Sequence, residues 1–176
     1  MSLFETNYSN NKQTNYTPLP EGEYECTITK AGLDATPGGT EYLAVNLKVR
    51  NDLDKALPDT NGKYHNRTVF VQFWKNKQTG KYNLDQLQYV LEAAGVPEGR
   101  SVKDWEDFSN LLVNKPVRAF VKVEKDTYQG KSTERNRVAP WGFSKTKFPF
   151  QSTTTTNDPF ANSKEDIEIT DEDVPF

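Results

Sequence analysis

Several segments of this chain alternate aliphatic residues with aromatic and basic ones, a pattern suited to binding single-stranded nucleic acid. In residues 67–74, Phe70 and Trp74 alternate with Val69, Val71 and Phe73. Aromatic rings stack on bases, Lys and Arg pair with phosphates, and neither interaction depends strongly on base sequence. The candidate DNA-binding residues are Lys48, Arg50, Phe70, Trp74, Arg118, Phe120, Lys122, Tyr128, Arg135, Arg137 and Trp141.

Each of these aromatic residues has an alternative role, packing beneath a helix or in a subunit interface. Trp141 stands beside Pro140 and Gly142 and fits either role. Trp105 and Phe108, by contrast, share a helical stripe and are predicted to belong to the core. The argument for binding is that rings and bases fall on the same faces of the predicted strands.

The residue patterns give little support to catalysis, a cofactor or a metal. His65 is the only histidine and lies in a polar loop, so a nucleophile–histidine pair has no other choice. Gly130-Lys131-Ser132 resembles the end of a phosphate-binding loop, but Lys125 stands where the earlier glycine is required. The aspartates of residues 52–59 lack the glycine and terminal glutamate of a calcium loop. We therefore predict a binding protein rather than an enzyme, without cofactor or metal.

Hydrophobic periodicity divides the body of the chain into strands and helices. Period-two alternation predicts strands over residues 22–30, 41–50, 67–74, 116–124 and 133–141. Helical spacing predicts two helices, 84–94 and 102–112, the second capped by Ser101, and residues 126–131 form a loop. The fold predicted is mainly β, a five-stranded OB-fold barrel with a helical insertion between strands three and four. SH3-like barrels share the strand count but normally lack such an insertion.

Charge and composition suggest one domain with two polar ends. Residues 151–176 hold seven acids and one base, a net charge of −6, whereas the other 150 residues hold 21 bases and 18 acids, a net of +3. We expect a flexible Asn-rich arm at 1–15, one domain at 16–150 and a disordered acidic tail at 151–176. A basic body with an acidic arm is typical of a protein that binds polyanions.

Cys26 is the only cysteine, so no intrachain disulfide is possible, and a buried core position is predicted for it. No apolar run follows Met1, and no segment reaches membrane-spanning length. These features predict a cytosolic protein without a membrane partner.

The last six residues, Asp171-Glu172-Asp173-Val174-Pro175-Phe176, have the composition of a docking motif. The Phe176 ring could fill an apolar pocket while the carboxylates meet Lys or Arg side chains around it. The alternative is an acidic tail that only confers solubility, but such a tail has no use for Val174 and Phe176 at its tip.

This ending resembles the tip of bacterial single-stranded-DNA-binding proteins, in which a run of Asp leads to an apolar residue, Pro and Phe. Val174 stands where the bacterial tip usually has Ile, and Glu172 interrupts the Asp run. With its element order and the segment Leu91–Gly99, the whole chain looks like a bacteriophage-encoded single-stranded-DNA-binding protein.

The resemblance implies a protein that coats and protects single-stranded DNA in phage replication, recombination and repair. It implies that residues 171–176 recruit replication and recombination proteins, and it places the protein in the cytoplasm of the infected bacterial host. A homodimer or homotetramer would add binding sites. Two alternatives stay open: a recombination mediator or annealing protein, and a structural or interaction module that does not bind DNA.

Overall fold

The computed structural model describes residue 5 and residues 17–150. Its strands are β1 (Gly22–Ala35), β2 (Glu41–Val49), β3 (Thr68–Trp74), β4 (Pro116–Tyr128), β5 (Lys131–Arg137) and β6 (Phe143–Lys145). Two helices, α1 (Leu84–Ala93) and α2 (Trp105–Leu112), lie between β3 and β4, and short helical turns occupy Pro58–Gly62 and Pro140–Gly142. Apart from Glu5, the arm predicted at 1–15 and the tail at 151–176 lie outside the described residues.

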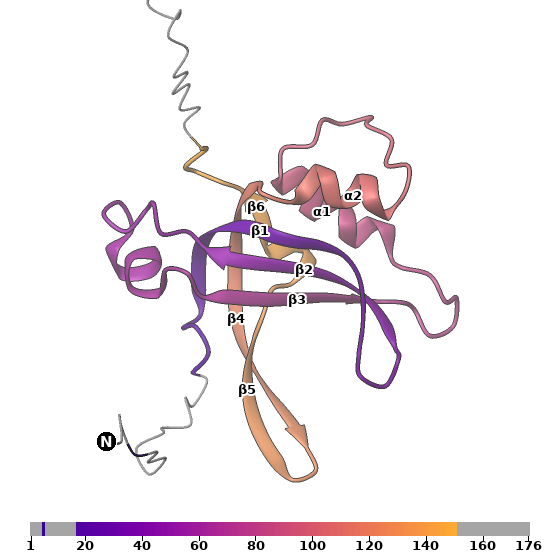
Figure 1. Ribbon diagram of the computed structural model, residues 1–176, viewed down its shortest axis with the longest axis horizontal. Helices are drawn as coiled ribbons and strands as arrows, with labels where there is room; N and C mark the ends of the chain where they lie inside the picture. Colours follow the sequence, from indigo (N-terminus) through magenta and orange to yellow (C-terminus); the bar gives the residue numbers. More distant parts are fainter. Residues whose placement is uncertain (1–4, 6–16, 151–176) are drawn as a thin grey trace, which may run out of the picture.

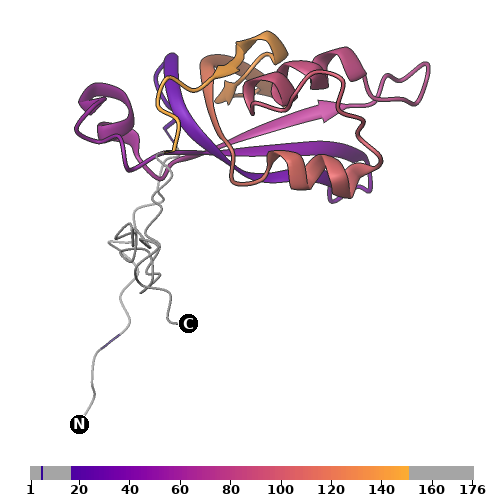
Figure 2. The same cartoon turned by 90° about the horizontal axis from the view of Figure 1, so that it is seen from above.

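The strands form one six-stranded antiparallel sheet in the order β3-β2-β1-β4-β5, with β6 also paired to β4. The predicted mainly β class and the helices between the third and fourth strands are therefore confirmed. In Figure 1 the β4–β5 hairpin projects away from the rest of the sheet. Helix α1 packs against β6 and α2 against β1, and Figure 2 shows the two helices apart from each other.

The alternating apolar residues of the central strands make the core, as their period predicts. Leu43, Val45 and Leu47 of β2 are fully buried, and they pair with the buried face of β3. Phe108 and Leu112 of α2 pack into the same cluster, together with Leu87 and Val90 of α1. This core holds β2 and β3 so that their alternate residues face outward.

β1 is longer than predicted because a bulge interrupts its alternation. The register shifts between Ile28 and Lys30, so Ala31 rather than Lys30 is buried. Strict alternation would place Lys30 on the buried face with Cys26 and Ile28, and the bulge avoids this. A bulge also bends its strand, and Figure 2 shows β1 curving along its length.

The helix start and the last predicted strand need correction. Asp104, not Ser101, caps α2, because its carboxylate accepts a hydrogen bond from the Asp107 backbone N–H at 2.8 Å. The strand predicted at 133–141 ends at Arg137, because a helical turn beginning at Pro140 interrupts it before β6 continues beside β4.

The loop predicted at 126–131 is a tight hairpin instead. β4 and β5 continue to Tyr128 and Lys131, and both turn residues have left-handed backbone, with φ of 50° at Gln129 and 76° at Gly130. Two positive φ angles suit the two-residue turn that matches the strand twist. Tyr128 therefore lies at the end of a long ribbon.

Candidate nucleic-acid interface

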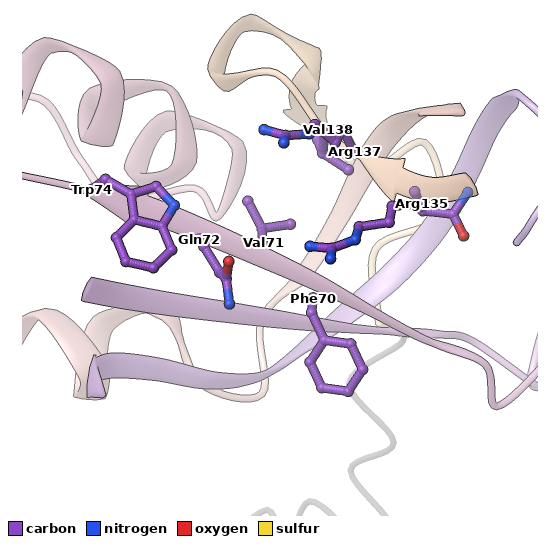
Figure 3. Close-up of a pocket in the computed structure, with 8 residues that line it drawn as sticks. Phe70, Val71, Gln72, Trp74, Arg135, Arg137 and Val138 are labelled. Carbon is purple, nitrogen blue, oxygen red and sulfur yellow. The ribbon is translucent and has the colours of Figure 1, made fainter. Parts of the chain in front are cut away.

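A groove of 570 Å³ opens between β3 and β5, the two strands at the ends of the sheet order. We call it the seam groove. Figure 3 shows Phe70, Gln72 and Trp74 spaced along β3, with Arg135 of β5 extending toward them. Its full lining is Phe70, Val71, Gln72, Trp74, Arg135, Asn136, Arg137 and Val138.

The aromatic side of the seam groove follows from strand alternation. Val69, Val71 and Phe73 are buried, so Phe70 and Trp74 face outward, with 61% and 45% of their surface exposed. The Trp74 ring contacts the ring of Tyr42, its cross-strand neighbour, and the two ring centroids are 5.0 Å apart. One face of β3 thus presents two rings to solvent with Gln72 between them.

The basic side of the seam groove comes from β5. Arg135 lies 3.4 Å from an Asp126 carboxylate oxygen, and Nε of Arg137 lies 2.8 Å from Oε2 of Glu124. Both arginine side chains are about 60% exposed. Exposed ion pairs of this kind contribute only about 0–1 kcal/mol, so both guanidinium groups remain available to an anionic ligand.

A second, smaller hollow of 350 Å³ gathers another part of the predicted set. We call it the Trp141 hollow; its lining residues are Glu23, Phe120, Lys122, Ala139, Trp141, Gly142 and Ser144. The Trp141 indole is 70% exposed. Of the predicted site residues, the seam groove collects Phe70, Trp74, Arg135 and Arg137, and the Trp141 hollow collects Phe120, Lys122 and Trp141.

Four other predicted residues, Lys48, Arg50, Arg118 and Tyr128, line neither space. Lys48 is exposed on β2 opposite Thr68, and Tyr128, 72% exposed, lies at the end of the β4–β5 hairpin. Arg118 is mostly covered, because its Nε donates to Ser144 Oγ at 2.9 Å and its Nη1 lies 3.5 Å from Glu23. Arg118 therefore holds β4 to β6.

The prediction that Arg50 lies on the exposed face is wrong, since only 5% of this residue is exposed. Its guanidinium pairs with Asp52 and donates to the Phe148 carbonyl at 2.5 Å. It also lies 4.5 Å from the centre of the Phe150 ring. Contacts with a segment almost 100 residues away cover this arginine, and strand alternation cannot reveal them.

The same segment is held by a buried acid of β1 that strict alternation would place on the polar face of the strand. Glu25 is 2% exposed, and its carboxylate accepts hydrogen bonds from the Thr146 hydroxyl and the Lys147 backbone N–H. Glu25 and Arg50 thus fix residues 146–148 against the ends of β1 and β2. We call residues 146–150 the C-terminal strap.

Gln72 is a lining residue of the seam groove that the site prediction missed. The signal was available, because Gln72 lies midway between Phe70 and Trp74 on the same strand face. Its amide can donate and accept hydrogen bonds at base edges. The predicted partner-docking site lies outside the described residues; it comprises Asp171, Glu172, Asp173, Val174, Pro175 and Phe176.

Cys26 is buried, as predicted, and burial raises the pKa of its thiol to about 12. Because the thiolate is the reactive form, we expect an aromatic disulfide reagent at about pH 8 to leave the native protein unlabelled and to label it in urea. Absorbance of the released thiolate measures both reactions. Rapid labelling of the native protein would show instead that β1 opens to solvent.

Within residues 17–150 and Glu5, no group of three or more His, Cys, Asp or Glu side chains is arranged to hold a metal ion. None of the helices in this part of the chain has the length and apolar character needed to cross a membrane.

The fold and the two hollows together define a mainly β protein with an open surface groove between its end strands. The chain belongs to the family described as "Protein of unknown function (DUF669)", whose model matches residues 4–159. No curated protein matches the chain.

Proposed function

We propose that this protein binds single-stranded DNA in the seam groove and coats it, without catalysis. The observation that carries the proposal is the pairing of two exposed rings, Phe70 and Trp74, with two exposed arginines, Arg135 and Arg137, across one groove. Bases would stack on the rings of β3 while phosphates pair with the guanidinium groups of β5.

The same arrangement explains a preference for single strands. In a duplex the flat faces of the bases are covered by their neighbours, whereas a single strand can offer successive bases to Phe70 and Trp74. Stacking and phosphate pairing accept any base, so the expected binding has little sequence preference. This is the behaviour of a protein that protects DNA during replication, recombination and repair.

We propose further that the sheet is an OB-fold barrel that closes along the seam groove. The strand order β3-β2-β1-β4-β5 supports this, as does the position of the helices between β3 and β4. In OB folds the strand face and neighbouring loops bind oligonucleotides. The β4–β5 hairpin, which carries Tyr128 at its end, would be one such loop.

The ends of the chain complete the proposal. Residues 16–150 would be the DNA-binding domain of a bacteriophage-encoded protein acting in the cytoplasm of the infected host, as a homodimer or homotetramer. Residues 171–176 would recruit replication and recombination proteins. The acidic segment 151–176 would compete with DNA for the basic face by charge attraction.

The test is fluorescence anisotropy with labelled oligo-dT, its duplex counterpart and the equivalent RNA, measured across a salt series. We expect oligo-dT to bind more tightly than duplex, with log K falling linearly as log[salt] rises. Replacing Arg135 and Arg137 with glutamine is expected to reduce the magnitude of that slope by about 1.4, since each phosphate contact to a single strand contributes about 0.7. A chain ending at Gln151 is expected to bind more tightly.

The matched control is Lys55→Gln/Lys103→Gln, which removes the same charge from exposed positions outside both hollows. It is expected to leave the salt slope nearly unchanged. Absence of binding by the full and shortened chains would overturn the proposal and favour the structural or interaction module. Rapid annealing of complementary strands, together with a stable recombinase complex formed through the body, would favour the mediator class.

A further inference from the structure

The Trp141 hollow has the same two kinds of side chain as the seam groove. Phe120 and Trp141 contribute rings and Lys122 contributes a cation. Among the described residues, no ring–ring or cation–π contact involves the Trp141 indole. A large exposed indole beside a cation is suited to stacking on a base.

The turn that carries Trp141 is held firmly against the sheet. Pro140 restricts the backbone at its start, and Gly142 lies so close to β4 that an added Cβ would be 3.3 Å from the Phe120 carbonyl oxygen. The neighbouring Val138 and Phe143 are buried. These buried neighbours fix the position of the turn, and in that position the Trp141 indole is exposed.

The two hollows meet at a pair of like charges. Lys122 of β4 and Arg137 of β5 are directly opposite each other in the antiparallel pair. Lys122 lines the Trp141 hollow, and Arg137 lines the seam groove. Directly opposed residues have Cβ atoms about 5 Å apart, so these two cations repel each other, and the pairing of Arg137 with Glu124 offsets only part of that repulsion. A phosphate placed between them would offset this repulsion.

We infer that a bound single strand continues from the seam groove, past Lys122 and Arg137, into the Trp141 hollow, where a further base stacks on the indole. This inference rests on the proposed function and extends it, because it assigns a second base-binding position and an order of contact. Short oligonucleotides occupy the seam groove alone, and longer ones occupy both spaces.

Tryptophan fluorescence separates the two positions. The chain has three tryptophans, so W105F/W141F reports on Trp74 and W74F/W105F reports on Trp141. Each variant is titrated with oligo-dT from about 4 to about 16 nucleotides, the range that one OB domain covers. We expect every length that binds to quench Trp74, and only the longer ones to quench Trp141.

Affinity gives the second measurement. W141A is expected to weaken binding of the longest oligo-dT about 10-fold and to change binding of the shortest by less than about twofold. Tyr89→Ala removes an exposed ring from α1 outside both hollows and is expected to change neither affinity. Thermal unfolding of each variant checks that the fold is intact.

The outcomes distinguish this inference from the function on which it rests. Quenching of Trp74 without quenching of Trp141 at any length would overturn the second position and leave the seam groove supported. Equal weakening of short and long oligo-dT by W141A would also overturn it. No response from either tryptophan and no binding in anisotropy would overturn both proposals.

Discussion

Replacing Phe70 and Trp74 together by alanine is expected to weaken oligo-dT binding at least about 30-fold. Each base–ring stack contributes about 1–3 kcal/mol, and each tenfold change in Kd corresponds to about 1.4 kcal/mol. The loss should persist at high salt, because the variant leaves the charges of Arg135 and Arg137 in place. Anisotropy in a salt series measures the effect.

The control for this variant is Leu84→Ala/Tyr89→Ala, which removes two exposed apolar side chains from α1. It should bind oligo-dT like the natural chain. The folding cost of the Phe70 and Trp74 changes should be small, since Phe70 is largely exposed and Trp74 is nearly half exposed and contacts the Tyr42 ring. Unchanged affinity in a folded F70A/W74A protein would remove the seam groove as the stacking site.

Replacing Arg50 with methionine is expected to lower the free energy of unfolding by about 2–4 kcal/mol. The change leaves the Phe148 carbonyl without its charged donor and Asp52 without its ion-pair partner. The hydrogen bond with Arg50 also holds the pKa of Asp52 below its usual range. The stability that this ion pair contributes is therefore fully present above the unfolded-state pKa of Asp52 and is lost as the pH falls through its folded-state pKa. Urea unfolding monitored by circular dichroism measures the effect.

Lys48→Met is the matched control, because Lys48 is an exposed cation only two residues earlier in the chain. It should change stability by less than about 0.5 kcal/mol. The stability of Arg50→Lys should lie between those of Arg50→Met and Lys48→Met, since lysine keeps the charge but loses the bidentate contact with Asp52. An Arg50→Met protein of normal stability that fails to bind oligo-dT would restore Arg50 to the binding site.

The strand faces that carry the seam groove were predictable from sequence because they depend on local alternation. Val69, Val71 and Phe73 of β3 face the core, and this alone determines where Phe70 and Trp74 point. Wherever the backbone departs from strict period two, the prediction fails. The bulge in β1 and the turn at Pro140–Gly142 both have this effect.

Long-range contacts are the other limit of sequence reasoning. Arg50 and Glu25 look like surface residues by alternation, but their side chains are hydrogen-bonded to the C-terminal strap, 98 residues after Arg50 and 121 residues after Glu25. The division of the predicted set into two hollows also depends on tertiary structure. No local pattern indicates that β5 lies beside β3, or that Trp141 lies beside Phe120.

The C-terminal strap also determines how mechanical load would enter the protein. Residues 146–148 are bonded to Glu25 and Arg50, at the ends of β1 and β2. Tension applied to the chain after Phe150 therefore acts first on those hydrogen bonds and on the centre of the sheet, before it can reach β3 or the β4–β5 hairpin. A partner that pulls on the chain after Phe150 would therefore move the whole protein without separating β3 from β5.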